Sequence, residues 1–294
     1  MRVGREILKG FVDIHVHAGP SIATRELDAA DLIKVAGAAG YRAVVVKDHY
    51  FPTVMSTRVA QKHFGDETTE IFGSIVLNNA LGLFNLKAVD TAYNMGAKIL
   101  WFPTVSSKNH IDSHKGGKFP GSGSSTVAEV PVVYVDEKGV MNPDAVKVLE
   151  YMAENDMALG TGHGSAWEVD HLIHKAFEIG IKRVLVSHPH FLTGASYQQM
   201  AKWAEMGAYI EFNVSVFSDG AKLGPLPWEV ADRVLEAVPL KSIILNSDLG
   251  QAGNGCPVEG MYNFIQLLMQ RNGLTAADIE LIGKTNPSAL IGIG

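Results

Sequence analysis

Short apolar runs alternate with amphipathic stretches along almost the whole chain. Eight runs rich in β-branched and aromatic residues predict buried strands at residues 11–17, 43–47, 71–77, 98–102, 157–160, 183–187, 208–212 and 242–245. Near-continuous apolar strands are typical of a parallel sheet that is covered on both faces. The pattern therefore predicts an α/β protein built on eight parallel strands.

The stretches between these runs have helical periodicity and recognisable ends. Helices are expected over residues 28–40 and 142–155, and glycines at positions 40, 96, 180 and 207 separate a helix from the next strand. In a capping box, a Ser or Thr and the third residue after it satisfy each other's backbone N–H groups. Three more helices are expected to begin in this way, at Ser165 with Glu168, Ser196 with Gln199 and Thr275 with Asp278. The last should end before Gly283.

Eight such units in 294 residues predict a (β/α)8 TIM barrel. No linker divides the chain, so residues 1–294 are expected to form one domain. An open, doubly wound sheet is the alternative. It has less support, because no Gly-x-Gly-x-x-Gly sequence follows the first strand to form a dinucleotide site.

One connection is much longer than the others. It follows the fourth strand, spans residues 106–131 and includes a glycine- and serine-rich stretch at 116–125. A loop after a barrel strand lies at the carboxyl rim, where barrel enzymes keep their chemistry, so we predict a binding loop or lid. A plain surface insertion is the alternative. Residues 132–142 predict a small hairpin that turns at 137–139.

Composition excludes several classes of protein. The chain is 47% hydrophobic and 19% charged, with a net charge of −6, which excludes a disordered chain and gives no basic face for nucleic acid or an anionic membrane. No apolar run reaches the roughly 20 residues of a membrane helix, and the first ten residues lack a signal-peptide core. We expect a cytoplasmic protein that acts on a small molecule. Its oligomeric state stays open, with a homodimer as the common default.

Histidines at the strand ends are the main chemical signal. The chain has eleven histidines and one cysteine, so any metal site must use nitrogen and oxygen ligands. His15 and His17 lie two apart on the first strand and point to the same side. His163, His188 and Asp248 follow the fifth, sixth and eighth strands, whose ends a barrel brings together. This pattern predicts a metal centre at the rim.

The segments DIHVH, GTGH, VSHPH and NSDLG resemble those of the amidohydrolase superfamily of metal-dependent barrel hydrolases. The resemblance extends over residues 11–292 and includes the closing segment NPSALIGI. It implies a divalent metal, with zinc the first choice and manganese the second. It also implies that His15, His17, His163 and His188 are ligands, and that Asp248 is both ligand and acceptor of the proton from the attacking water. His190, two residues after His188, is the alternative ligand from the sixth strand.

The sequence departs from that family at one strand. Two-metal members usually carry a carboxylated lysine or a glutamate at the end of the fourth strand, where this chain has neither. One interpretation is a single-metal enzyme in which His188 positions substrate or water. The other is that Lys47, at the end of the second strand, is carboxylated and bridges two ions. A plain ion pair of Lys47 with Asp48 or Asp248 is a third explanation.

Other polar residues near the rim are candidates for substrate binding. Arg25 follows the first strand and could bind a substrate carboxylate. The remaining candidates are His49, His110, His114 and His190. Glu211 lies within the seventh strand and must be paired if it faces the interior of the barrel.

These features together predict a metal-dependent hydrolase that acts on an amide, cyclic amide, ester or lactone. A phosphoester hydrolase of the polymerase-and-histidinol-phosphatase type is the main alternative, because it shares the His-x-His start and an Asp-His element like Asp48–His49. Its last strand would carry Asp-x-His, whereas Asp248 is followed by Leu249 and Gly250. A non-hydrolytic decarboxylase is a further alternative. A catalytically silent binding barrel is disfavoured, because the set of metal-ligating residue types is complete.

Overall fold

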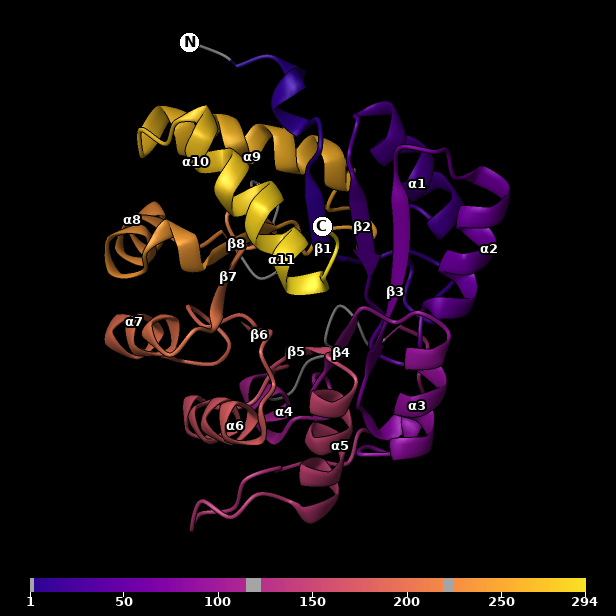
Figure 1. Cartoon of the computed structure of the whole chain (residues 1–294), viewed down its shortest axis with the longest axis vertical. Helices are drawn as coiled ribbons and strands as arrows, with labels where there is room; N and C mark the ends of the chain where they lie inside the picture. The colour runs from indigo at the N-terminus through magenta and orange to yellow at the C-terminus, as the bar shows by residue number, and fades with distance from the viewer. Residues whose placement is uncertain (1–2, 115–122, 219–224) are drawn as a thin grey trace.

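Eight parallel strands form a barrel in the computed structural model, which describes residues 3–114, 123–218 and 225–294 (Figure 1). The strands pair in chain order and are β1 (Val12–Val16), β2 (Ala43–Val46), β3 (Glu70–Val76), β4 (Ile99–Trp101), β5 (Ala158–Gly160), β6 (Val184–Val186), β7 (Tyr209–Asn213) and β8 (Ile243–Asn246). Backbone hydrogen bonds join β8 back to β1, from Asp248 N to His15 O at 2.7 Å and from His17 N to Leu249 O at 2.8 Å. The predicted (β/α)8 barrel is confirmed.

Helices surround the strands (Figure 1). They are α1 (Ala29–Ala38), α2 (Val54–Phe64), α3 (Leu86–Asn94), α4 (Lys108–Ser113), α5 (Pro143–Glu154), α6 (Ala166–Ile179), α7 (Tyr197–Glu205), α8 (Trp228–Ala237), α9 (Pro257–Arg271), α10 (Ala276–Glu280) and α11 (Asn286–Ile291). Short 3-10 turns lie at η1 (Arg5–Leu8), η2 (Asn79–Leu81) and η3 (Leu240–Ser242). Among the described residues, no helix has the length and apolar character needed to span a membrane.

The three predicted capping boxes are all present, at the starts of α6, α7 and α10. The last of these helices, α10, ends at Glu280, before Gly283, as predicted. The chain then continues through a π-helical stretch, η4 (Leu281–Thr285), into α11. Gly283 is needed there for close packing, because a Cβ at this position would lie 2.1 Å from the ring of Phe11.

Two apolar cores lie on the two faces of the sheet. One fills the barrel interior and includes Val12, Ile14, Val45 and Trp101, with Leu290 of α11 joining it. The other lies between the strands and the helices and takes the alternate strand residues, such as Val44, Val46, Leu100 and Phe102. Both faces of each strand are therefore buried, which explains why the strand sequences are continuously apolar.

Strand β1 contains an irregularity that decides where its histidines point. Between Asp13 and Val16 it advances three residues while β2 advances two, from Val44 to Val46. One extra residue of this kind is a β-bulge, and it reverses the alternation of side chains along the strand. Val12 and Ile14 belong to the interior core and Val16 to the outer core. His15 and His17, after the bulge, therefore face the interior as well.

The long connection after β4 runs along the carboxyl rim. Within it, Ser124 N donates to Ile22 O in the loop after β1 at 3.3 Å, and Val130 N donates to Asn79 Oδ1 after β3 at 2.6 Å. The predicted hairpin is a single antiparallel bridge, Val135 to Met141, with a turn between them. Most of the predicted glycine- and serine-rich stretch, residues 116–122, lies outside the described residues.

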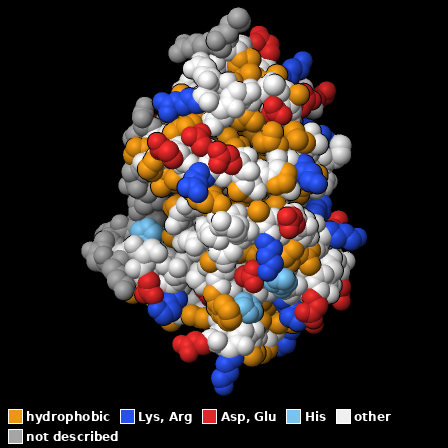
Figure 2. Space-filling view, turned by 90° about the vertical axis from the view of Figure 1, so that its left-hand side faces the viewer, with side chains coloured by type: hydrophobic (Ala, Val, Ile, Leu, Met, Phe, Trp, Pro, Cys, Tyr) orange, Lys and Arg blue, Asp and Glu red, His pale blue; other side chains and the backbone are white. Residues whose placement is uncertain are grey.

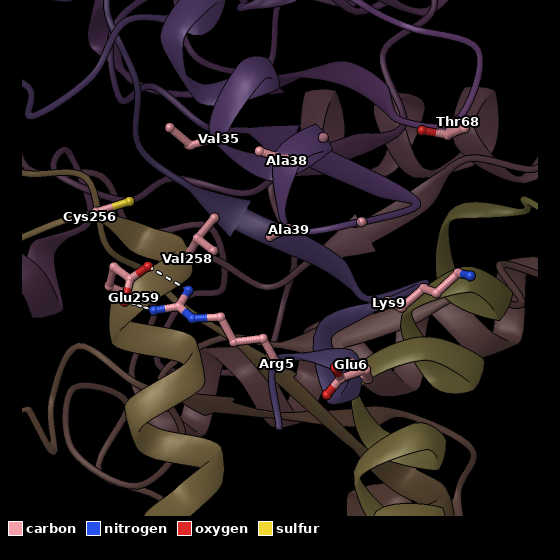
Figure 3. Close-up of a pocket in the computed structure, with 12 residues that line it drawn as sticks. Arg5, Glu6, Lys9, Val35, Ala38, Ala39, Thr68, Cys256, Val258 and Glu259 are labelled. Carbon is pink, nitrogen blue, oxygen red and sulfur yellow. Dashed lines mark hydrogen bonds and ion pairs between the residues drawn. The ribbon is translucent and has the colours of Figure 1, made fainter. Parts of the chain in front are cut away.

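One pocket on the outer surface is separate from the candidate site residues at the rim. Acidic and basic side chains are interspersed on the face drawn in Figure 2. A pocket of about 620 Å³ lies on the outside of the barrel between η1, α1 and the start of α9, and an Arg5–Glu259 ion pair of 2.6 Å forms part of its wall (Figure 3). None of the candidate site residues lines this pocket.

Candidate metal centre

Five residues predicted as metal ligands meet at the carboxyl end of the barrel: His15, His17, His163, His188 and Asp248. Ring centroids lie 5.4 Å apart for His15 and His17, 5.3 Å for His15 and His188, and 5.1 Å for His163 and His188. The four histidines are buried, and the Asp248 side chain is 13% exposed. The barrel thus brings together residues that lie more than 200 positions apart in sequence.

His15 is oriented by Glu211, which reaches it from β7. His15 Nδ1 lies 2.6 Å from Glu211 Oε1, and both side chains are fully buried. A carboxylate only accepts hydrogen bonds, so Nδ1 carries the hydrogen and the Nε2 lone pair is turned away from Glu211. Burial and the charge of Lys47 oppose protonation, but the carboxylates of Asp248 and Glu211 outweigh them and raise the pKa of His15.

His188 is held in the same way through a chain of amides. Its Nδ1 lies 3.0 Å from Asn213 Oδ1, Asn213 Nδ2 donates to Asn246 Oδ1 at 2.6 Å, and Asn246 Nδ2 donates to Glu211 Oε1 at 2.8 Å. Glu211 Oε2 also accepts from the backbone N–H of His188 at 3.0 Å. Glu211 can only accept, so Asn246 and Asn213 both donate in its direction and Asn213 presents its oxygen to His188. His188 Nδ1 therefore carries the hydrogen, and Nε2 has the lone pair that can bind a metal.

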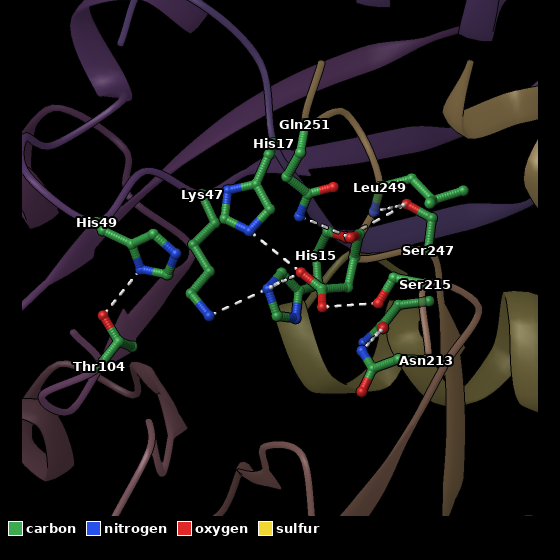
Figure 4. A network of polar contacts seen from close by, with 12 residues as sticks. His15, His17, Lys47, His49, Thr104, Asn213, Ser215, Ser247, Leu249 and Gln251 are labelled. Carbon is green, nitrogen blue, oxygen red and sulfur yellow. Dashed lines mark hydrogen bonds and ion pairs between the residues drawn. The ribbon is translucent and has the colours of Figure 1, made fainter. Parts of the chain in front are cut away.

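Figure 4 labels His15, His17 and Ser215, whose polar atoms lie near the carboxylate of Asp248. Asp248 Oδ1 lies 3.1 Å from His15 Nε2 and 3.1 Å from His17 Nε2. Asp248 Oδ2 accepts from Ser215 Oγ at 2.9 Å and lies 4.0 Å from His188 Nε2. The His15 lone pair on Nε2 faces this carboxylate, and two buried acceptors are unfavourable together unless a cation lies between them. The donor set of imidazoles and a carboxylate fits zinc or manganese.

Two of these residues have unusual backbone conformations. His188 and Asp248 both have a φ of 48°, in the left-handed region that most L-residues avoid. Each follows the last residues of its strand, so the left-handed turn takes the chain out of the β conformation and directs the side chain over the mouth of the barrel. Gly250 continues the turn after Asp248, with a φ of 108° and no room for a Cβ beside the His17 carbonyl.

Lys47 extends into the same cluster from the end of β2. Its side chain is fully buried, and Nζ lies 3.0 Å from His15 Nε2 and 4.3 Å from the centre of the Trp101 ring. Burial lowers the pKa of Lys47 to about 8, against the opposing effect of the nearby carboxylates. In the described part of the chain, Lys47 forms no ion pair with a carboxylate, so the expected pairing with Asp48 or Asp248 is absent.

The long connection supplies a histidine that contacts His163. His110, on α4, is buried and stacks on His163 with ring centroids 4.9 Å apart, and the two Nδ1 atoms lie 2.9 Å apart. His163 Nε2 is buried and has no hydrogen-bond partner among the described residues. His114 stacks on His110 and its Nδ1 lies 2.8 Å from the His110 carbonyl. The sequence predicted His110 and His114 as candidates for substrate binding on the long connection, and it did not predict the contact of His110 with His163.

The Arg25 side chain is buried beside the cluster, and one terminal nitrogen of its guanidinium is paired with a carboxylate. Its Nη2 donates to Asp48 Oδ2 at 3.2 Å, and the guanidinium side chain is 3% exposed. Its Nε is buried and finds no acceptor among the residues that the structure describes. After burial, the charge of Arg25 is the main influence that lowers the pKa of His17, to about 3, so Arg25 acts on the site electrostatically.

The other two candidates for substrate binding lie in different surroundings. His49 follows β2, and its Nδ1 lies 2.9 Å from Thr104 Oγ1 within the cluster. His190 instead lies among aromatic side chains on the helix side of β7, stacked on Phe217 at 5.7 Å. The structure brings His188 to the cluster and leaves His190 outside it.

Several residues of the site had a weak signal or none in the sequence. Glu211 was predicted only to need a partner, and Asn246 and the hydroxyl of Thr104 had no assigned role. The signal that could have found them is polar residues within apolar strands, in the segments YIEFN and IILNS. A buried amide or carboxylate in such a strand needs a partner, and alternate residues of β7 face the same side as Glu211.

Comparison with known proteins shows the fold and a family match. The model of DUF6282, a family of unknown function, matches residues 10–211, and no protein with a curated description matches the sequence. An amidohydrolase from Pseudomonas aeruginosa superposes with a TM-score of 0.63 at 11% identity, over 98% of each chain.

Two further solved structures are similar. A probable 2-pyrone-4,6-dicarboxylic acid hydrolase from Acinetobacter baumannii has a TM-score of 0.61 at 11% identity, over 96% of this chain and 99% of that one. Organophosphorus hydrolase from Deinococcus radiodurans has a TM-score of 0.58 at 14% identity, over 99% of this chain and 94% of that one. At such identities the similarity shows the fold alone.

Proposed function

The chain belongs to the family of unknown function DUF6282, and we propose that it is a metal-dependent hydrolase of the amidohydrolase superfamily. One observation carries the proposal. His15, His17 and Asp248 offer ligand atoms that lie within 4.8 Å of one another, and both Nε2 atoms are 3.1 Å from Asp248 Oδ1. Their surroundings turn the His15 lone pair toward Asp248, because Glu211 holds the other nitrogen. An arrangement of this kind is built for a cation.

The residues that would hold the ion are His15, His17 and Asp248, with His188 and His163 completing the set. Zinc is the first choice and manganese the second, because both accept imidazole and carboxylate ligands. When bound, such an ion acts as a Lewis acid and makes an attacking water available near neutral pH.

Asp248 is the residue that moves the proton. Its Oδ2 faces the cluster and accepts only from Ser215 in the described part of the chain. At this atom the carboxylate can accept a proton from the attacking water and return it to the leaving group. His188, 4.0 Å away at Nε2, lies where it can orient substrate or water. The bond cleaved on this proposal is an amide, cyclic amide, ester or lactone of a small molecule.

Lys47 decides between one ion and two. A carboxylated Lys47 would bring an additional pair of oxygens to the His15 side of the cluster, where Nζ already lies 3.0 Å from Nε2. An uncarboxylated Lys47 would supply no bridging oxygens, and the remaining ligands would then hold a single ion. Metal stoichiometry separates these cases: two ions in the wild type that fall to one or none in Lys47→Ala support the bridge, and one ion in both proteins excludes it.

Arg25 indicates which charge the proposed substrate carries. Its guanidinium is buried next to His17 and His49, Asp48 engages one nitrogen, and Nε has no acceptor among the described residues. A buried, incompletely paired guanidinium is well suited to bind a carboxylate. We therefore expect a substrate that carries an anionic group beside the scissile bond. His110 and His114 complete the wall of the substrate site on the side of α4.

The test combines metal analysis with a substrate panel. Purified protein is analysed for zinc and manganese and assayed on lactones, hydantoin-like rings, N-acyl amino acids and phosphoesters. Asp248→Asn should abolish turnover of the substrate found, whereas Asp31→Asn, an exposed aspartate on α1, should leave it unchanged. Retained activity in Asp248→Asn would remove that residue from its role, and absence of both metal and metal-stimulated activity would end the proposal.

Phosphoester hydrolysis is the second candidate, since Asp48 and His49 lie beside the histidines of β1. The phosphoester arm of the panel decides it. Decarboxylation is distinguished by release of carbon dioxide without consumption of water.

A further inference from the structure

We propose that His49 is a neutral hydrogen-bond donor to the substrate and not a metal ligand, and that Asn78 and Thr104 fix it in the required tautomer. The tautomer follows from the hydrogen bonds of the described residues alone. The role toward a substrate rests on the proposed function.

His49 lies at the edge of the candidate metal centre. Its ring centroid is 5.1 Å from that of His17 and 5.8 Å from that of His163, and the side chain is buried. One nitrogen, Nδ1, faces Thr104, and Figure 4 shows the other turned toward Lys47 and His17. A histidine in this place could be a ligand or a donor, depending on which nitrogen carries the hydrogen.

The hydrogen bonds of Asn78 fix the orientation of its amide. The oxygen Oδ1 accepts from the backbone N–H groups of Thr104 at 2.8 Å and Ser106 at 3.2 Å. The nitrogen Nδ2 must then face the opposite way, where it donates to His49 O at 2.8 Å and to Thr104 Oγ1 at 2.6 Å. A flipped amide would place its nitrogen against two backbone donors, so the assignment is unambiguous.

The hydroxyl of Thr104 then fixes the ring of His49. Thr104 is fully buried, and within residues 3–114, 123–218 and 225–294 its Oγ1 has two partners, Asn78 Nδ2 and His49 Nδ1. Because Asn78 donates to it, the hydroxyl hydrogen has one acceptor left within reach, His49 Nδ1. In the opposite tautomer both neighbours would donate to Oγ1 and the buried hydroxyl hydrogen would have no acceptor.

His49 therefore carries its hydrogen on Nε2. A protonated ring nitrogen cannot bind a metal, but it can donate to an oxygen on which negative charge develops during the reaction. Its neighbours in the cluster, His15 and His188, are held the opposite way, with the hydrogen on Nδ1 and the lone pair on Nε2. The rim thus separates histidines that bind a cation from one that binds substrate oxygen.

The tautomer is tested first, without substrate, on metal-free protein labelled with ¹⁵N-histidine. The signals of His49 are assigned by their loss in His49→Leu. We expect a protonated Nε2 and an unprotonated Nδ1 in the wild type and in Thr104→Ser, and a mixture of tautomers in Thr104→Val, which keeps the shape but lacks the hydroxyl. A protonated Nδ1 in the wild type would overturn the proposal.

Metal content gives an independent measurement. After loading with zinc, His49→Leu, His49→Gln and Thr104→Val should all retain the wild-type number of ions per chain. Loss of an ion from either His49 variant would show that His49 is a ligand and would refute the assignment.

Activity is measured last, with p-nitrophenyl acetate as the ester probe or with a substrate found in the panel. His49→Leu should lower kcat by about 100-fold or more with little change in KM, as expected when one donor to a developing oxyanion is removed. His49→Gln, which keeps an N–H donor, should recover part of that loss. Unchanged kcat in His49→Leu would contradict the donor role. A wild type that turns over no substrate would refute the proposed function while the tautomer and metal results still stand.

Discussion

Four histidines of the rim are oriented through their Nδ1 atoms. His15 is held by Glu211, His188 by Asn213, His163 by His110 and His49 by Thr104. Each partner is buried, so the ring cannot turn without leaving a polar group unsatisfied. What each histidine can do is therefore decided by a neighbour on another strand or in another loop.

Glu211 is the most consequential of these partners. Glu211→Gln keeps the shape of the side chain but removes its charge and replaces one acceptor oxygen with a donor that would face the backbone N–H of His188. We expect metal affinity to fall by about 10–100-fold, as is usual when a group that orients a ligand is lost. The measurement is a competition titration against a chromophoric chelator.

Glu205→Gln on α7 is the matched control, because Glu205 is exposed and lies away from the rim. It should leave the affinity unchanged. Equal affinities in Glu211→Gln and the wild type would show that Glu211 does not act through His15 and His188.

Metal-ligating residue types at strand ends could be predicted from the sequence. Residues whose role comes from a tertiary contact could not. His15, His17, His163, His188 and Asp248 follow apolar strands, and a barrel must bring such positions together. His110 gave no such signal, because it lies in a long connection whose path is set by tertiary packing. Its burial against His163 could not be predicted from spacing along the chain.

Strand β1 shows most clearly that the alternation of side chains along a strand does not always predict which face a residue occupies. In a regular strand, His15 and His17 would lie on the face opposite Val12 and Ile14. The bulge before Val16 lets all four face the interior. Sequence analysis correctly placed the two histidines on one side, but it could not say which side, because a bulge has no distinct signal in five residues of a strand.

The packing of β5 against β4 gives a prediction for the interior. A Cβ on Gly160 would lie 2.2 Å from the Trp101 ring, which in turn supports Lys47 and His15. Gly160→Ala should therefore lower the free energy of unfolding by about 1–3 kcal/mol, the usual cost of overpacking a core. Chemical denaturation measures the difference.

Gly37→Ala in α1 is the control for this change. Its Cβ would lie 3.0 Å from Asp66 Oδ2 and 3.6 Å from Thr69 Oγ1, which are side-chain atoms and not backbone, and alanine is the better helix former. The stability of this variant should equal or exceed that of the wild type. A Gly160→Ala variant as stable as Gly37→Ala would show that Trp101 can move aside.

At the scale of the whole molecule, the barrel explains why so much of the fold could be predicted. Each of the eight predicted strands is present, because each is buried on both faces and is therefore apolar throughout. The connection after β4 could not be predicted in the same way. Its contacts with Ile22 and Asn79 join loops that are distant in sequence and carry no periodicity.

Removal of metal should lower the stability of the whole barrel. His15 on β1, His17 just after β1 and Asp248 just after β8 lie where the sheet closes, so an ion held by them would join the first and last strands. Binding at a thousandfold excess over Kd adds about 4 kcal/mol to the free energy of unfolding, which amounts to several degrees in Tm. Calorimetry with and without chelator measures the shift.

A double variant of His171 and His174 to alanine is the control, since both lie on the outer surface of α6. It should show the same chelator-dependent shift as the wild type, whereas His15→Ala should lose the shift. A wild-type Tm that does not respond to chelator would count against a structural metal at this site.

The left-handed backbone at His188 and Asp248 limits how this site can be lost during evolution. Aspartate, asparagine, histidine and glycine are the residues that accept such a conformation at low cost. A relative that no longer needs the carboxylate is therefore expected to replace Asp248 with asparagine or glycine, each a single nucleotide away, and not with alanine or valine. In such relatives, an asparagine or glycine at this position would indicate that the left-handed backbone of the site persists after the catalytic carboxylate has been lost.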